Sequence, residues 1–205
     1  MRLVFASNNG HKLAEVRKIL SGIEVVSLHD IGFEQEIEET GLTLEENSAI
    51  KAETVWEWLS LRGCEEDIDG VFADDTGLEI DALDGEPGVY TARWAERETG
   101  VHLGEMETYA ANREKALREL AGKANRGCQF RTVVTLIRAG KSIQVEGVVR
   151  GMMTKQEYGE GGFGYDPIFI PDGYDKTFGE LPAEIKNNIS HRARALEALV
   201  RILHE

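Results

Sequence analysis

Cysteine and long apolar runs are scarce in this sequence, and each scarcity excludes a class of protein. Its 205 residues hold two cysteines, Cys64 and Cys128, without the spacing of a zinc site or a disulfide framework. We therefore expect reduced thiols that pack in the interior of a cytoplasmic protein. No apolar run approaches the roughly 18 residues of a membrane span, so we predict no membrane partner. The first residues form a strand pattern rather than a basic and then apolar leader, so we expect no signal segment.

Basic residues are also in short supply. Lysine and arginine number 23 against 37 acidic residues, which gives a formal charge of −14. Because lysine and arginine supply most of the affinity for a nucleic-acid backbone, we predict that nucleic acid is not a partner. A protein this acidic binds a small anion only by gathering its few cations in one pocket or by recruiting a metal ion. At this length we expect a single domain over residues 1–205.

What is present is an alternation of strand and helix patterns. Helices are indicated where a capping residue precedes apolar residues spaced three or four apart, as after Thr43 and Ser190. The stretch Ala139-Gly140-Lys141 is typical of a hairpin turn between two strands. These features predict an α/β fold with a mixed sheet. We expect strands at 2–6, 24–28, 71–73, 129–138 and 142–150, helices near 9–21, 43–59, 104–121 and 190–203, and a loop at 95–104 that could close over a site.

The turn Ser7–Lys12 connects the first strand to the first helix. Main-chain N–H groups point outward at the start of a helix, and the helix dipole adds partial positive charge there. Asn8 and Asn9 add amide donors, and Lys12 adds a full positive charge about one turn into the helix. This arrangement can receive a phosphate, although it matches neither G-x-x-x-x-G-K-[ST] nor G-x-G-x-x-G. The alternative is a capped helix with a solvated lysine.

Asn47 and Lys51 are four residues apart in the second predicted helix, so they share one face of it. A lysine beside an amide is a candidate for a second anion site. The alternative is a solvated pair, because exposed helices carry many such pairs without binding a ligand.

Two pairs of acidic residues are candidates for metal chemistry. Asp74 and Asp75 follow the buried run 71–73, and charged residues after a buried strand lie where open α/β sheets bind ligands. Because successive strand residues point to opposite faces, we expect one aspartate to bind a metal or water and the other to pair with a cation. An ordinary turn is the alternative. If the stretch that carries Glu38 and Glu39 is extended, only one of them can face inward, and two carboxylates plus substrate phosphates suffice for Mg²⁺.

A glycine-rich stretch at 160–167 sets aromatic rings among glycines. Glycines let a backbone approach a flat ligand closely, and a ring such as Phe163 can stack on a base. Asp166 can accept hydrogen bonds from a base edge. The alternative is a tight turn whose rings lie in the core.

His191 and Arg192 lie in the first turn of the last predicted helix. The helix dipole disfavours cations at that end, so their position costs stability unless an acidic neighbour or an electron-rich ligand compensates. Lys186 lies five residues before His191. We therefore include these three residues among the candidates for ligand binding.

Six motifs occur in one order along the chain. They are Ser7-x-Asn9-x-x-Lys12-x-x-Glu15, Thr43-Leu44-x-Glu46-Asn47-x-x-x-Lys51-Ala52, Ala73-Asp74-Asp75-Thr76-Gly77-Leu78, Gly85-x-Pro87-Gly88-Val89-Tyr90-Thr91-Ala92-Arg93, Gly162-Phe163-Gly164-Tyr165-Asp166-Pro167 and Ile189-Ser190-His191-Arg192. Together they resemble the inosine/xanthosine triphosphate pyrophosphatase family, whose members remove deaminated purine nucleotides from the nucleotide pool. The resemblance covers residues 2 to about 203. Thr76 and Thr91 stand where many relatives have serine, and both keep a hydroxyl.

The resemblance implies an elongated α/β fold of two lobes with a nucleotide-binding cleft between them, assembled as a homodimer. It implies Mg²⁺-dependent hydrolysis of ITP, dITP and XTP to the monophosphate and pyrophosphate. Catalytic roles are implied for Asp75, as general base and metal ligand, and for Lys12 and Lys51. The second metal ligand would be Glu38 or Glu39, with Glu38 favoured. Substrate contacts are expected from Ser7, Asn8, Asn9, Gly10, His11, Lys12, Asn47, Thr76, Phe163, Gly164, Tyr165, Asp166, Lys186, His191 and Arg192.

Two other functions are compatible with these motifs. One is a related pyrophosphatase that acts on modified pyrimidine or 7-methylguanine nucleotides, which a panel of substrates would separate. The other is a nucleotide-binding or sensor protein without catalytic activity. The joint presence of Lys12, Lys51 and Asp75 favours an enzyme, because we expect a degenerate member to have lost one of them.

Overall fold

The computed structural model describes residues 1–63 and 67–204, so Cys64 lies outside the described residues. The chain divides into two compact units, each made of several segments. Unit 1 comprises Met1–Asp75, Thr132–Gly147 and His191–Glu205, and unit 2 comprises Thr76–Arg131 and Val148–Ser190. The organisation of residues 1–205 as a single domain stays a prediction.

A mixed sheet of seven strands and flanking helices confirm the predicted α/β class. The strand order is β2-β1-β3-β5-β6-β7, and β4 pairs with β3. Strand β1 is parallel to β2 and β3, whereas β4 and β7 are antiparallel to β3 and β6. The strands are β1 Arg2–Phe5, β2 Glu24–Ser27, β3 Gly70–Ile80, β4 Pro87–Gly88, β5 Gly127–Arg138, β6 Lys141–Met153 and β7 Phe169–Pro171. The α-helices are α1 Gly10–Ile19, α2 Leu44–Ser60, α3 Trp94–Thr99, α4 Glu105–Glu119, α5 Ala183–Ile189 and α6 His191–Leu203.

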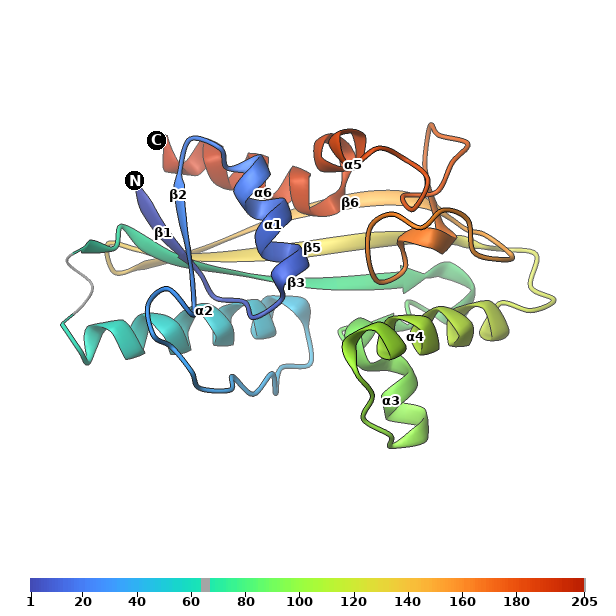
Figure 1. The fold of residues 1–205 in the computed structure, drawn as a ribbon, viewed down its shortest axis with the longest axis horizontal. Coiled ribbons are helices and arrows are strands. Elements are labelled where there is room, and N and C mark those ends of the chain that lie inside the picture. The colour runs from blue at the N-terminus through green and yellow to red at the C-terminus, as the bar shows by residue number, and fades with distance from the viewer. Residues whose placement is uncertain (64–66, 205) are drawn as a thin grey trace. The chain divides into compact units, whose positions relative to one another are not determined.

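Unit 1 has an apolar core on each face of its part of the sheet. Leu3 and Phe5 of β1 pack with residues of α1 and α6, and Val4 packs with residues of α2. This division follows from the alternation of side chains along a strand. Figure 1 accordingly shows α1 and α6 on one face of these strands and α2 on the other.

The helices that carry the candidate site residues in unit 1 begin at side-chain caps. Asn9 caps α1, because its Oδ1 accepts a hydrogen bond from the Lys12 N–H at 2.9 Å. Thr43 caps α2 as predicted, and its Oγ1 accepts from the Glu46 N–H at 3.1 Å. Glu46 in turn accepts from the Leu42 N–H at 2.6 Å. These bonds satisfy donors that a helix start otherwise leaves without partners.

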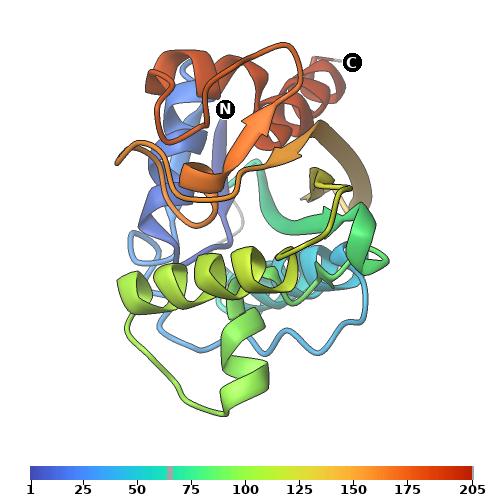
Figure 2. The ribbon, with the colours of Figure 1, turned by 90° about the vertical axis from the view of Figure 1, so that its right-hand side faces the viewer.

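Unit 2 packs α4 over its own apolar core, which includes Trp94, Ala116 and Phe130, and the 3₁₀ segment 91–93 contacts α4. Figure 2 shows α3 beside α4, joined to it by residues 100–104. The prediction of a loop over 95–104 is therefore wrong for 95–99, which belong to α3. The helix is only six residues long, too short to produce a legible apolar period, and its Ala95 N–H donates to Asn112 of α4 at 2.8 Å.

Strand β3 is longer than predicted. The expected strand ended at Ala73, but the structure continues it to Ile80, so Asp74 and Asp75 lie inside a buried strand rather than after it. An ordinary turn at these residues is excluded for the same reason. The charges of Asp74 and Asp75 are compensated by lysine and arginine side chains that are distant in the sequence. The apolar pattern of the strand does not reveal such partners.

The expectations about the cysteines and about membrane spans can also be compared with the structure. Cys128 is buried in the core of unit 2, and burial raises the pKa of its thiol to about 12, as befits a packing residue. Within residues 1–63 and 67–204, no helix is long and apolar enough to cross a membrane.

Candidate functional site

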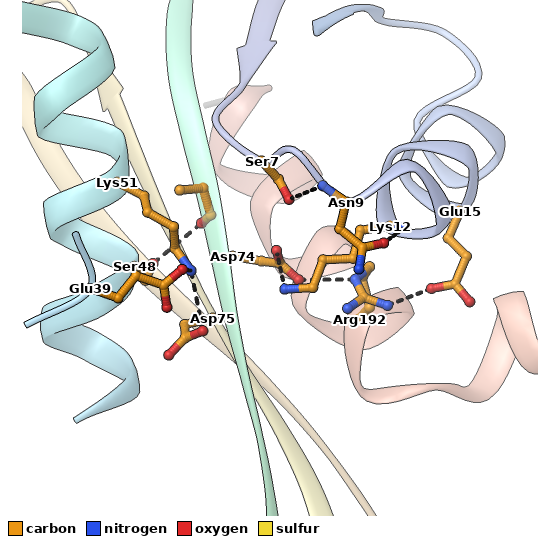
Figure 3. A network of polar contacts seen from close by, with 11 residues as sticks. Ser7, Asn9, Lys12, Glu15, Glu39, Ser48, Lys51, Asp74, Asp75 and Arg192 are labelled. Atoms are coloured by element: carbon orange, nitrogen blue, oxygen red, sulfur yellow. Dashed lines mark hydrogen bonds and ion pairs between the residues drawn. The ribbon is translucent and has the colours of Figure 1, made fainter. Parts of the chain in front are cut away.

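Asp74 and Asp75 divide the polar residues of unit 1 into two groups. Figure 3 shows their side chains on opposite sides of β3, Asp74 toward Lys12 and Asp75 toward Lys51. The predicted orientation of the two aspartates toward opposite faces is therefore present in the structure and arises from strand alternation, and each of them pairs with a lysine.

The Asp74 group is a buried network of two cations and two carboxylates. Asp74 is 1% exposed and accepts hydrogen bonds from Lys12 Nζ at 2.9 Å and Arg192 Nε at 3.0 Å. Arg192 is 2% exposed and also donates through Nη1 to Glu15 of α1. Charge-assisted bonds of this kind are about twice as strong as neutral ones. The carboxylates thus compensate the unfavourable position of Arg192 at the start of α6, as the sequence required.

Burial and ion pairing compete in this network. Burial alone would raise the pKa of Asp74, but Lys12 and Arg192 outweigh it and hold that pKa well below its usual range. Burial lowers the pKa of Lys12, and Asp74 opposes this effect. For Arg192, burial is outweighed by Asp74 and Glu15, and the pKa of the guanidinium is raised.

The Asp75 group lies on the α2 side of β3. Lys51 Nζ is 3.2 Å from Asp75 Oδ1 and 3.2 Å from Glu39 Oε1. Lys51 and Asp75 are buried, whereas the Glu39 side chain is 34% exposed and Glu38 is exposed. Only one of the two glutamates thus faces inward. Within the described residues, Asp75 Oδ2 is buried without a hydrogen-bond partner.

Opposing effects also act on the Asp75 group. Burial raises the pKa of Asp75 more than Lys51 and Lys12 lower it. Burial would lower the pKa of Lys51, but the carboxylates of Asp75, Glu39 and Asp74 outweigh it, so the ammonium form is favoured. Lys51 is therefore a charged side chain held by two carboxylates.

The turn predicted to receive phosphate lies at the start of α1. Asn8, Gly10 and His11 are exposed, while Ser7 and Asn9 are half-buried. Ser7 Oγ accepts from the Asn9 N–H at 3.3 Å, and this bond stabilises the turn that precedes α1. The turn therefore leaves a helix start accessible, next to a lysine that Asp74 already holds.

Asn47 contacts the acidic segment rather than Lys51. Its Oδ1 accepts from the Gly41 N–H at 2.8 Å, and this bond ties the segment that carries Glu38 and Glu39 to the first turn of α2. A Cβ at Gly41 would lie 2.6 Å from that oxygen, so glycine permits the close approach. Asn47 Nδ2 is buried and, within the described chain, has no partner.

Unit 2 brings together three of the residues expected to contact the substrate. Asp166 Oδ2 accepts from the Phe163 N–H and from Lys186 Nζ, both at 2.7 Å. Lys186 Nζ also lies 4.6 Å from the centre of the Phe163 ring, a cation–π contact. This cluster combines one carboxylate, one ammonium and one partly exposed ring.

The remaining candidates occupy varied environments. Tyr165 belongs to the core of unit 2 and donates from its hydroxyl to the Thr91 carbonyl at 2.9 Å, so its ring packs as the alternative reading proposed. Thr76 follows Asp75 on β3 and is half-buried. Gly164 Cα carries no side chain, but its carbonyl accepts from Arg113 at 2.9 Å. His191 is the first residue of α6 and is buried.

Two residues in these clusters received no role from the sequence. Glu15 lay in a quoted motif, but its contact with Arg192 joins residues 177 positions apart, which no local pattern reveals. Tyr109 of α4 lies with its ring centre 6.1 Å from that of Phe163. Its position in an amphipathic helix gave no sign of this neighbour.

Metal binding can be assessed from the donor atoms. Within residues 1–63 and 67–204, no group of three or more His, Cys, Asp or Glu side chains is arranged to hold a metal ion. Asp75 with one of Glu38 and Glu39 provides two carboxylates, which is enough for Mg²⁺ when phosphates and water complete its shell. The unpartnered Asp75 Oδ2 fits such a ligand.

Comparison with known proteins agrees with the motifs. A dITP/XTP pyrophosphatase of Flavobacterium johnsoniae is 45% identical over 204 residues, which cover 99% of this chain and 98% of the relative. A dITP/XTP pyrophosphatase of Bacillus subtilis is 44% identical, with 98% and 96% covered. The Staphylococcus aureus Ham1 protein superimposes with a TM-score of 0.82 and 36% identity, over 100% of this chain and 98% of that one. Because a model of the Ham1 family also matches residues 3–202, this chain belongs to the Ham1 family.

Proposed function

We propose that this protein hydrolyses the non-canonical purine nucleoside triphosphates ITP, dITP and XTP to the monophosphate and pyrophosphate, and so keeps them out of DNA and RNA. Relatives that match nearly the whole chain are named dITP/XTP pyrophosphatases. The observation that carries the proposal is the buried carboxylate of Asp75, bound on one oxygen by Lys51 and left open on the other within the described chain. A buried acceptor without a partner costs free energy, which a ligand at this position recovers.

Asp75 would act as general base and Lys12 and Lys51 as electrostatic catalysts. Water attacks the α-phosphorus, its proton passes to the Asp75 carboxylate, and the bond between the α- and β-phosphates breaks to release pyrophosphate. Negative charge grows on the leaving oxygens. Lys12, Lys51 and the N–H groups at the start of α1 would stabilise that charge more in the transition state than in the ground state.

Mg²⁺ would be held by Asp75 and by Glu38 or Glu39. The contact of Glu39 with the lysine that binds Asp75 favours Glu39, whereas the resemblance favoured Glu38. When bound, Mg²⁺ supplies positive charge that offsets the charge of the triphosphate and of the leaving pyrophosphate. Comparison of Glu38→Gln with Glu39→Gln would identify the ligand, because only one of them should weaken metal binding strongly.

The base would be selected by its 6-position. Inosine and xanthosine present a carbonyl there, whereas adenine presents an amino group. Donors such as Lys186, His191 and Arg192 satisfy a carbonyl but leave an amino group unpaired, and such sites reject the wrong partner by about 10⁴-fold or more. Phe163 would stack on the ring and Asp166 would accept a hydrogen bond from its edge. Asp74 and Glu15 would orient Arg192.

The test is pyrophosphate release with Mg²⁺ from ITP, XTP, GTP and ATP at one concentration. We expect rapid turnover of ITP and XTP, little of GTP and ATP, and none after chelation of the metal. Asp75→Asn should lower kcat by at least 100-fold, as loss of a general base does. Equal turnover of all four nucleotides would contradict the proposed selectivity, and full activity of Asp75→Asn would contradict the mechanism. We further expect a cytoplasmic homodimer, which fractionation and sedimentation velocity would test.

A further inference from the structure

The ammonium group of Lys51 lies where two carboxylates of unit 1 converge. Its Nζ is 3.2 Å from Asp75 Oδ1 and 3.2 Å from Glu39 Oε1, and Figure 3 shows it between the two side chains. Lys51 is buried at this position. The lysine thus supplies a cation to the carboxylates proposed above as metal ligands.

We propose that Lys51 holds the place of the divalent cation in the nucleotide-free protein and gives up its carboxylates when that cation binds. The inference rests on the proposed function of the site. Buried carboxylates require a cation, and the lysine provides one in the absence of metal. A metal ion bound by the same two carboxylates, through Asp75 Oδ2 among other oxygens, takes over the neutralisation of their charge and repels the ammonium, so Lys51 is then released to contact the triphosphate.

The charges of the group support an exchange rather than simultaneous binding. Lys51, Asp75 and Glu39 sum to one negative charge. Replacement of the ammonium by a divalent cation leaves the two carboxylates neutralised, and the released lysine adds a positive charge for phosphate. Binding of the metal therefore places two positive groups, the metal and the released lysine, where they can contact phosphate. This predicts that the nucleotide binds well together with its metal and poorly without it.

Lys12 provides a matched comparison in the same unit. It is a lysine of equal charge, it is also largely buried, and it pairs with Asp74 on the other side of β3. Asp74 has Arg192 as a second partner. Removal of Lys12 therefore changes the local charge as much as removal of Lys51 does, but it opens no place between Asp75 and Glu39.

The experiment measures the affinity of the nucleotide-free protein for Mn²⁺ by isothermal titration calorimetry. Lys51→Met removes the ammonium group that competes with the metal for the two carboxylates. This variant should therefore bind Mn²⁺ at least about tenfold more tightly than the wild type. Lys12→Met should change the affinity less than about threefold, since its charge acts from farther away. An unchanged or weaker affinity of Lys51→Met would overturn the proposal, as would an equal gain in both variants.

A second measurement uses the wild-type chain and so does not depend on the folding of a variant. With ¹³C-labelled lysine, the Cε signal of Lys51 should shift saturably as Mg²⁺ is added without nucleotide, while that of Lys12 stays in place. A Lys51 signal that remains fixed while calorimetry shows metal saturation would refute the exchange. Pyrophosphate release is assayed separately, so a wild type that turns over ITP but shows no exchange disproves this inference and not the proposed function.

Discussion

The buried network around Asp74 makes a quantitative prediction about stability. Asp74→Asn removes the negative charge that Lys12 Nζ and Arg192 Nε contact at 2.9 and 3.0 Å, while both cations stay in place. Removing one partner of a buried ion pair costs about 3–5 kcal/mol, because the remaining charge is left uncompensated. Near this chain length, 1 kcal/mol shifts the melting temperature by about 2–4 °C, so a decrease of about 6–20 °C is expected.

The network also predicts how stability depends on pH. The pKa of Asp74 is lower in the folded protein than in the unfolded chain. The carboxylate therefore contributes its stability above the pKa of the unfolded state, about 3.9, and loses it as the pH falls toward the lower folded value. Asp74→Asn lacks this contribution, so its melting temperature should fall less steeply than that of the wild type as the pH is lowered below about 4.

Thermal unfolding followed by circular dichroism between pH 3 and 7 measures both effects. Glu24→Gln is the control, because it removes a carboxylate from an exposed pair with Arg2 and should leave the melting temperature nearly unchanged. A decrease at pH 7 below about 2 °C for Asp74→Asn would refute the reasoning, since it would mean that the network is solvated.

Two further substitutions test the packing of each unit. Gly147→Ala should lower the melting temperature markedly, since a Cβ there would collide with the main chain at the start of α6. Gly22→Ala is the control, because there is open space around that residue. Equal melting temperatures of the two variants would contradict the close packing of β6 on α6. Tyr165→Phe should cost about 1 kcal/mol in urea unfolding, because the hydroxyl donates to the buried Thr91 carbonyl at 2.9 Å, and a cost near zero would show that this bond is not formed.

Features determined by neighbouring residues were predictable from the sequence. The cap of α2 is an example, since Thr43 and Glu46 are three residues apart and satisfy the helix start by themselves. The opposite orientation of Asp74 and Asp75 is another, because it follows from strand alternation alone. The hairpin between β5 and β6 likewise forms at Ala139 and Gly140, which both have positive φ.

Features determined by distant partners were not predictable. The end of β3 was predicted too early because charged residues usually indicate that a buried strand has ended. The cations that compensate Asp74 lie 62 and 118 residues away, where a local pattern does not reveal them. The choice between Glu38 and Glu39 was open for a similar reason. It depends on how an irregular segment is tied to α2 through Gly41 and Asn47, and no period or propensity describes that segment.

The long sequence separation within the Asp74 network has a consequence for synthesis on the ribosome. Lys12 precedes Asp74 by 62 residues, whereas Arg192 follows it by 118. At about 5–20 residues per second, Asp74 is synthesised about 6–24 seconds before Arg192. In that interval the network lacks Arg192, the cation that contacts both Asp74 and Glu15, so its burial remains incomplete. The buried network therefore forms only after the last helix has been synthesised, and a chain interrupted before residue 191 should remain sensitive to proteases.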